Sequence, residues 1–183
     1  MATAISQSIR LKMLIFYSLK NLYVFFKPHK CIVLDYMELV VTTKCNLSCK
    51  KCANFIPFYK NKEPFYSVEF LNLQIDNLLK CVDYIDSFGI LGGEPFLHPD
   101  LDKIITVLSK KRQINSIIIV TNATILPRKS RLIRALKNKK VSIYISNYGK
   151  YSYNRNKLID LCNRNKIKWD ISTFNVGSSD YYW

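Results

Sequence analysis

Short apolar runs typical of strands alternate along this chain with segments whose apolar residues recur at helical spacing. The runs Met37–Val41 and Ile117–Val120 are rich in β-branched side chains, which favour strands. In a segment between them, Leu71, Ile75 and Leu78 fall on one face of a helix. This alternation predicts a parallel sheet with crossover helices. The predicted strands cover residues 36–43, 84–91, 117–120, 141–146 and 167–172.

Five strands are too few to close an eight-stranded barrel. We therefore expect an α/β fold with an open parallel sheet, a partial (β/α) barrel of about five β-α units. The continuous β-branched run at residues 117–120 predicts a strand buried on both faces. Pro99 and Pro127 are expected at the first positions of two helices, because proline suits that position.

The N-terminal region, residues 1–35, is expected to form a helix and a lead-in to one domain over residues 36–183. Its apolar stretch is interrupted by Arg10, Lys12 and Lys20. A membrane span needs about 20 mostly apolar residues, so no transmembrane segment is expected. No small-residue cleavage site of a signal peptide follows. The stretch fits a helix that packs on the domain or contacts a membrane surface.

Basic residues outnumber acidic residues by 28 to 13, which gives a net charge of +15. Such an excess can attract nucleic acid, an anionic membrane or a phosphorylated substrate. The basic residues are dispersed and form no single stripe interleaved with aromatic residues. A solvated, lysine-rich surface explains them more simply, and nucleic acid is not expected as a partner.

Three of the six cysteines crowd into eight residues directly after the first predicted strand, as C-x₃-C-x₂-C at Cys45, Cys49 and Cys52. Thiolates are soft ligands that suit zinc or iron–sulfur centres. Iron–sulfur clusters normally take four protein ligands, so three thiolates on a four-iron cube would leave one iron open. An open position is typical of a catalytic metal centre.

Structural zinc is the alternative explanation of this loop, with Cys31, Cys81 or His98 as the fourth ligand. Otherwise Cys31, Cys81 and Cys162 are expected to be buried small residues, because free cysteine packs as a small hydrophobe. Crowded cysteines without a secretion signal suit a metal better than disulfides, so we expect a protein of the reducing cytoplasm.

A second motif, Gly-Gly-Glu-Pro at residues 92–95, ends the second predicted strand. In a parallel sheet the carboxyl ends of the strands share one edge, where ligands bind. Cys45 follows the first strand and Glu94 follows the second. The two motifs are therefore expected to face one another across that edge.

The combination resembles the radical S-adenosylmethionine (radical SAM) superfamily, over about residues 36–173. The resemblance implies that Cys45, Cys49 and Cys52 hold a [4Fe–4S] cluster whose open iron binds the amino and carboxylate groups of S-adenosylmethionine. One electron would cleave the S–C5′ bond, and the 5′-deoxyadenosyl radical would abstract hydrogen from a substrate that the sequence does not identify. It also implies an external one-electron donor such as flavodoxin or ferredoxin. The cofactors carry the difficult chemistry, and the protein aligns them.

The resemblance further implies a set of residues that bind the cofactor. Glu94 would accept a hydrogen bond from its ammonium group, and the two glycines would let the backbone approach. Polar pairs at the ends of the third and fourth strands would add contacts. The predicted cofactor-binding residues are Gly92, Gly93, Glu94, Pro95, Thr121, Asn122, Ser146 and Asn147.

Two features depart from the family pattern. Lys51 stands where an aromatic residue commonly precedes the third cysteine, and the chain ends about ten residues after its fifth strand, whereas the family core usually has six β-α units. The domain is therefore expected to be incomplete at its C-terminus. One alternative is a truncated, non-catalytic relative that binds cluster or S-adenosylmethionine. A zinc-stabilised basic nucleic-acid-binding module ranks last, because it leaves the Gly-Gly-Glu-Pro motif unexplained.

Overall fold

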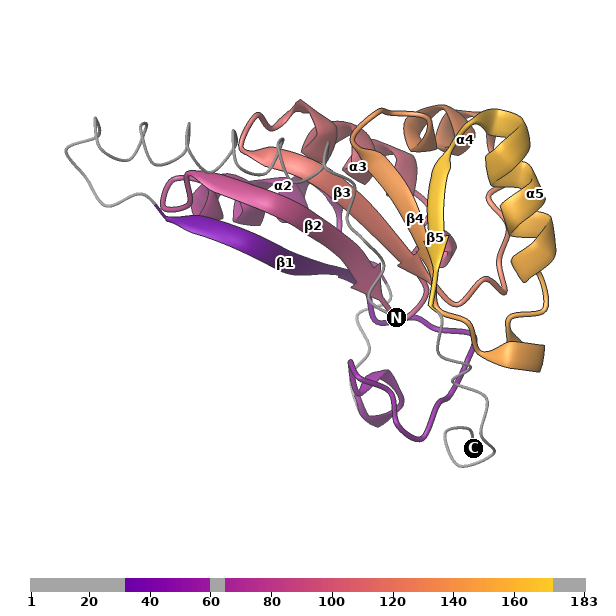
Figure 1. Cartoon of the computed structure of the whole chain (residues 1–183). Coiled ribbons are helices and arrows are strands. Elements are labelled where there is room, and N and C mark those ends of the chain that lie inside the picture. Colours follow the sequence, from indigo (N-terminus) through magenta and orange to yellow (C-terminus); the bar gives the residue numbers. More distant parts are fainter. Residues whose placement is uncertain (1–31, 60–64, 173–183) are drawn as a thin grey trace, which may run out of the picture. The chain divides into compact units, whose positions relative to one another are not determined.

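The strands of this chain form one parallel sheet. The computed structural model describes residues 32–59 and 65–172 of the 183. Within these residues, five strands are hydrogen-bonded in the order β1-β2-β3-β4-β5, all pairs parallel (Figure 1). Their bounds are β1 Val33–Thr42, β2 Tyr84–Gly92, β3 Ile114–Thr121, β4 Val141–Ile145 and β5 Lys168–Ile171. The predicted α/β fold with an open parallel sheet is confirmed.

Helices connect the strands on one side of the sheet (Figure 1). Sequential parallel strands joined by right-handed crossovers place their helices on the same face. The helices are α2 Val68–Leu78, α3 Leu101–Lys110, α4 Ser130–Leu136 and α5 Arg155–Asn165. Short 3₁₀ turns are η1 Ile56–Phe58, η2 Pro95–Leu97 and η3 Gly149–Tyr151.

The core lies between these helices and the outer face of the sheet, the face that the helices cover. Phe88 and Ile90 of β2 are completely buried there, and Ile105 and Leu108 of α3 are as well. Burying one such side chain contributes about 1.5–3 kcal/mol relative to leaving it exposed. This layer therefore supplies much of the stability of the domain.

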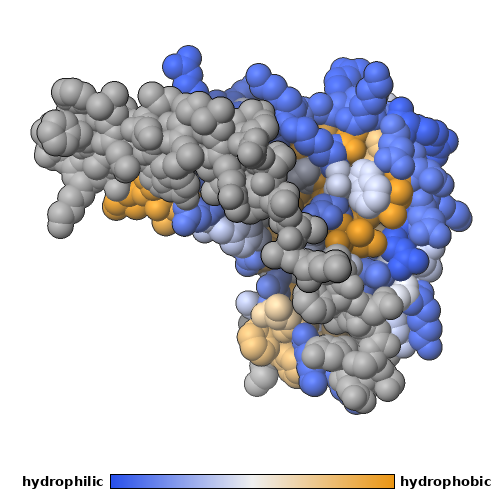
Figure 2. Space-filling model, in the orientation of Figure 1, coloured by the Kyte–Doolittle hydropathy of each residue, from blue (hydrophilic) through white to orange (hydrophobic). Residues whose placement is uncertain are grey.

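The opposite face, which we call the inner face, carries smaller and more polar side chains. Side chains alternate between the two faces along each strand, and paired residues share a face. The register places these residues on the inner face: Tyr36, Glu38 and Val40 of β1, Ser87, Gly89 and Leu91 of β2, Ser116, Ile118 and Val120 of β3, and Ser142 and Tyr144 of β4. Figure 2, in the same orientation as Figure 1, shows apolar surface over the strands, bordered by hydrophilic surface.

The prediction that residues 117–120 are buried on both faces is wrong. Ile117 and Ile119 are completely buried, whereas Ile118 and Val120 on the inner face are only half-buried. The reason is that the connecting helices cover one face alone. Half-open apolar side chains on the inner face leave space there for a ligand.

Helix α2 begins with a capped first turn, and two helix starts differ from the prediction. The Ser67 side chain accepts a hydrogen bond from the backbone N–H of Phe70, as an N-cap residue does. Pro99 does not begin α3, because the backbone N–H of Asp100 donates to His98 Nδ1 and holds a turn before Leu101. Pro127 lies in the loop before α4, which begins at Ser130.

The predicted N-terminal helix and its membrane-surface contact lie outside the described residues, except for residues 32–35. Strand β1 begins at Val33, earlier than the predicted start near Tyr36. Among the helices of the described ranges, none is long and apolar enough to cross a membrane.

Candidate functional site

A cavity of about 240 Å³ lies where the strands end, and all three cysteines of the C-x₃-C-x₂-C loop line it. Gly92 and Gly93 form part of the same wall. The two sequence motifs therefore meet at one edge of the sheet, as predicted. The remaining lining residues are Glu38, Leu47, Lys51, Ala53, Asn54, Leu91, Val120, Asn122, Ser146 and Tyr148.

The two glycines press the backbone of β2 against the start of the cysteine loop. A Cβ atom on Gly92, whose φ is +148°, would collide with the carbonyl oxygen of Thr42. One on Gly93 would collide with the carbonyl oxygen of Lys44. Because no side chain intervenes, the two backbones hydrogen-bond directly. The backbone N–H of Gly93 donates to Thr42 O at 2.8 Å, and that of Glu94 donates to Lys44 O at 2.9 Å. The position of Cys45 is thus fixed by main-chain contacts.

Asparagine side chains tie the cysteine loop to the neighbouring strands. Asn46 Nδ2 donates to Thr124 Oγ1 at 2.7 Å, and Asn122 Nδ2 donates to Asn46 Oδ1 at 3.3 Å. Asn54 Nδ2 donates to the carbonyl oxygen of Gly92 at 3.1 Å. These bonds hold both ends of the loop at the edge of the sheet.

The sulfur of Cys45 accepts contacts from two N–H groups. The backbone N–H of Leu47 lies 3.4 Å from Sγ, and Asn122 Nδ2 lies 3.9 Å from it. The pKa of Cys45 is raised to about 11, chiefly by burial; the Leu47 N–H lowers this pKa, and the charges of Glu94, Cys49 and Cys52 add to the increase. A bound metal would reverse this balance, because coordination deprotonates a thiol.

The donor set fits an iron–sulfur cluster. Cys45, Cys49 and Cys52 are half-buried around one cavity, and each of the other two raises the pKa of Cys45 through its charge. Within residues 32–59 and 65–172, no three Cys, His, Asp or Glu side chains are grouped tightly enough for one metal ion. Three thiolates are soft ligands that suit an iron–sulfur cluster, and they would leave one iron of a four-iron cube without a protein ligand.

Two of the three candidate fourth zinc ligands, Cys81 and His98, are not part of the cavity lining. Cys81 is exposed on the turn after α2, so the prediction that it is buried is wrong. His98 uses both ring nitrogens: Nε2 lies 2.9 Å from the carbonyl oxygen of Tyr66, and Nδ1 accepts from Asp100 N. Cys31 lies outside the described residues, and Cys162 is buried as predicted.

Glu94 lies beneath the cavity and is completely buried. Its Oε1 accepts from Thr121 Oγ1 at 2.8 Å and from the backbone N–H of Phe96 at 3.1 Å, and its Oε2 accepts from the backbone N–H of Asn122 at 2.9 Å. Burial raises the pKa of Glu94 to about 7, although these bonds lower it. The carboxylate is not among the lining groups, so its contact with a cofactor ammonium stays a prediction.

The other predicted cofactor-binding residues divide into two groups. Asn122 and Ser146 line the cavity. Pro95 and Thr121 are buried outside its lining. Asn147 Oδ1 accepts from Arg155 Nη1 at 2.6 Å, which directs this side chain toward α5.

Sequence reasoning missed three polar lining residues, Glu38, Asn54 and Tyr148. Glu38 is a charged residue inside an apolar strand run, a signal that could have identified it. No pattern marks Asn54 or Tyr148, which lie in irregular segments between the regular elements.

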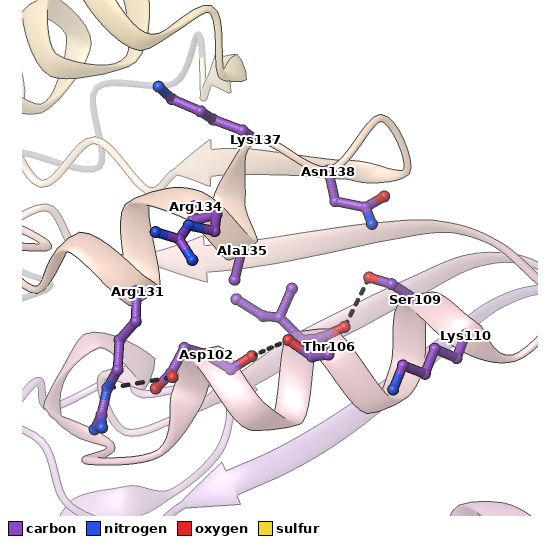
Figure 3. Close-up of a pocket in the computed structure, with 10 residues that line it drawn as sticks. Asp102, Thr106, Ser109, Lys110, Arg131, Arg134, Ala135, Lys137 and Asn138 are labelled. Carbon is purple, nitrogen blue, oxygen red and sulfur yellow. Dashed lines mark hydrogen bonds and ion pairs between the residues drawn. The ribbon is translucent and has the colours of Figure 1, made fainter.

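Another cavity, of about 510 Å³, lies between α3 and α4 (Figure 3). Arg131 and Asp102 form an ion pair at 3.2 Å on one of its walls, and Arg134 and Lys137 extend over another. None of the predicted site residues lines it. The predicted chemistry is therefore confined to the edge of the sheet.

Comparison with known proteins identifies relatives of this chain. The model of the radical SAM superfamily matches residues 39–170. GTP 3′,8-cyclase of Campylobacter lari is 32% identical over 113 residues, which are 61% of this chain and 34% of that enzyme. The chain thus spans about a third of the length of this curated relative.

Two solved structures share the fold. Streptococcus suis SuiB bound to S-adenosylmethionine matches with a TM-score of 0.61 and 18% identity, over 85% of this chain and 38% of that one. Native anSMEcpe with bound AdoMet and Cp18Cys peptide matches with a TM-score of 0.57 and 19% identity, over 76% of this chain and 42% of that one. At these identities the likeness supports the partial-barrel fold alone.

Proposed function

Because the chain belongs to the radical SAM superfamily, we propose that it cleaves S-adenosylmethionine reductively to start radical chemistry on a substrate. Membership of this family confirms the predicted cofactors, a [4Fe–4S] cluster and S-adenosylmethionine. The observation that carries the proposal is the meeting of Cys45, Cys49 and Cys52 with Gly92 and Gly93 around one cavity.

In this proposal the three cysteines hold the cluster through their thiolates. When bound and reduced, such a cluster would supply the one electron for cleavage of the S–C5′ bond of S-adenosylmethionine, which yields methionine and the 5′-deoxyadenosyl radical. The N–H groups of Leu47 and Asn122 stabilise the negative charge on Cys45 Sγ. Leu91 and Val120 supply an apolar wall, which limits water near the reacting groups.

The end of each strand adds one part of the cofactor site. Gly92 and Gly93 expose backbone to the methionine part, because they carry no side chain to block its approach. Ser146 and Tyr148, after β4, contribute hydroxyl groups to the cavity lining. We assign them to the ribose or adenine part. Glu94 orients the Thr121–Asn122 strand end from below.

The test is anaerobic reconstitution with iron and sulfide, followed by addition of dithionite and S-adenosylmethionine. We expect about four irons per chain and formation of 5′-deoxyadenosine. The Cys49→Ala variant should lose both. Cys81→Ala is the matched control, because Cys81 is exposed and lies outside the cavity, and it should keep both.

Two other outcomes would replace this proposal. An intact cluster without 5′-deoxyadenosine would identify a non-catalytic relative that binds the cofactors. Zinc in place of iron and sulfide, with binding to duplex DNA that weakens as salt rises, would identify the basic nucleic-acid-binding module.

GTP is the first substrate to test, because the matching relatives include GTP 3′,8-cyclases. The matched region is about a third of those enzymes, so their remaining two thirds have no counterpart in the alignment. GTP-dependent consumption of S-adenosylmethionine by the reconstituted chain would support a cyclase-like substrate. A rate unchanged by GTP would exclude it.

The family takes its electron from an external donor, and we propose flavodoxin or ferredoxin as this donor. The net charge of +15 favours an acidic partner, because opposite charges speed diffusional encounter. Reduction of the cluster by flavodoxin should therefore slow as ionic strength rises. A rate independent of salt would argue against a charge-steered donor.

A further inference from the structure

We propose that Glu38, and not Glu94, is the carboxylate that balances the positive sulfonium of S-adenosylmethionine in this cavity. The inference rests on the proposed function only in taking this cofactor as the occupant of the cavity. It assigns a role to a strand residue that lies outside both sequence motifs.

Glu38 lies on the inner face of β1, where its exposed side chain lines the same cavity as Cys45, Cys49 and Cys52. It is in register with Gly89 of β2. A ligand that enters the cavity from the cysteine loop toward the inner face therefore meets this carboxylate.

Tyr36 holds the Glu38 carboxylate in place. The Tyr36 hydroxyl donates to Glu38 Oε1 at 2.9 Å. Its ring lies against Gly89, since a Cβ atom there would lie 2.6 Å from Tyr36 Oη and 3.2 Å from the ring. Glycine at position 89 thus gives the phenol room to reach Glu38. A carboxylate fixed in this way loses less side-chain freedom when it meets a cation.

The charges around the cavity favour Glu38 for this role. Among the described lining residues, Glu38 is the one carboxylate and Lys51 the one ammonium group. Glu94 is completely buried, and both of its oxygens accept hydrogen bonds from the chain. Glu38 is thus the carboxylate of the described lining that a cationic group of the ligand can meet directly.

The apolar neighbours strengthen this attraction. Leu91 and Val120 line the cavity from the same inner face of the sheet as Glu38. A charge pair flanked by apolar groups interacts more strongly than one surrounded by water, because the effective dielectric constant is lower. Glu38 is therefore expected to contribute to affinity through the charge of the ligand and not through its shape.

The test compares two ligands that differ in charge at sulfur. S-adenosylmethionine carries a sulfonium, and S-adenosylhomocysteine carries a neutral thioether but the same amino, carboxylate and adenosine groups. Both dissociation constants are measured by anaerobic equilibrium dialysis with the reconstituted full chain. We expect Glu38→Gln to weaken S-adenosylmethionine binding about tenfold and to leave S-adenosylhomocysteine within about twofold of the wild-type value.

Glu69→Gln is the matched control, because Glu69 is an exposed glutamate on α2 and is not part of the cavity lining. It should change neither constant. Circular dichroism of both variants checks that the fold is kept. An equal loss of both ligands in Glu38→Gln, or a loss of neither, would overturn the proposal, as would failure of wild type to bind S-adenosylmethionine.

Tyr36→Phe provides a second measurement. Removing the hydroxyl frees the carboxylate without deleting its charge, so the loss of S-adenosylmethionine affinity should be smaller, about threefold. If Tyr36→Phe lost more affinity for S-adenosylmethionine than Glu38→Gln does, the proposal that Tyr36 acts by positioning Glu38 would be contradicted. Selective binding without release of 5′-deoxyadenosine would refute the proposed function and still support the role of Glu38.

Discussion

The two faces of the sheet differ in what their side chains do. On the outer face, Phe88 and Ile119 are completely buried against the helix layer. On the inner face of the same strands, Ser87 and Ser116 hydrogen-bond to each other at 3.2 Å, and Glu38 faces the cysteine cavity. The comparison indicates that the outer face of the strands stabilises the fold, whereas the inner face of the same strands carries the residues that face the cavity. Substitutions on the two faces should therefore have separable effects.

The largest effect is expected on the outer face. Phe88→Ala should lower the free energy of unfolding by about 3–5 kcal/mol, because it removes a completely buried ring and leaves a cavity. Urea denaturation of the apo protein measures the change. Phe70→Ala is the control, since Phe70 is 48% exposed on α2, and it should cost less than about 1 kcal/mol. Equal losses would remove the distinction between covered and open apolar residues.

Glu94 is a charged exception within the buried layer, and it should make stability depend on pH. Burial raises its pKa from 4.5 to about 7 in the folded state. The folded state then binds more protons than the unfolded state between these values, so the free energy of unfolding should fall as pH rises from 4.5 through about 7. Urea midpoints across this range measure the slope.

Glu94→Gln carries no titratable group at this position. In this variant the free energy of unfolding should depend less steeply on pH than in the wild type, because one titrating group has been removed. Identical slopes in the two proteins would mean that another group causes the pH dependence.

A smaller effect is expected among the serines of the inner face. Ser116 Oγ donates to the carbonyl oxygen of Asp86 at 2.8 Å and contacts Ser87 Oγ. Ser116→Ala should therefore cost about 1 kcal/mol in urea denaturation. Ser130→Ala, at the exposed start of α4, should change stability by less than about 0.5 kcal/mol. A cost for Ser116→Ala as large as that for Phe88→Ala would contradict the contrast between the faces.

The smallest change in stability is expected at Gly89. In Gly89→Ala the new methyl group displaces the half-exposed Tyr36 ring and breaks its bond to Glu38. Stability should change by less than about 1 kcal/mol, yet affinity for S-adenosylmethionine should fall as it does in Tyr36→Phe. Calorimetry and equilibrium dialysis measure the two quantities. Unchanged affinity would show that Tyr36 does not orient the carboxylate.

The location of the strands along the sequence could be predicted, because each strand is an apolar run between turn and helix signals. The half-open inner face could not, since Ile118 and Val120 are as apolar as the buried Ile117 and Ile119. Among residues 32–59 and 65–172, the helices cover the opposite face of the sheet, which leaves these two side chains partly exposed. Pattern alone therefore identified the strand and missed which of its faces is covered.

The cysteine spacing was sufficient to predict the candidate site, because three thiols within eight residues must lie close together. The complete burial of Glu94 was not predictable, since its hydrogen-bond partners Thr121 and Asn122 are 27 and 28 residues away in the sequence. Glu38 was visible as a charge within the apolar run Met37–Val41, but only the register places it on the inner face.

The contact of Gly92 and Gly93 with Thr42 and Lys44 joins main chain to main chain. No side chain there can change its rotamer to absorb an added methyl group. Saturation mutagenesis should therefore recover only glycine at these two codons, while the exposed Lys50 of the same loop accepts most amino acids. The close approach of the two backbones would thus explain both the tolerance of substitutions at Lys50 and the requirement for glycine at positions 92 and 93.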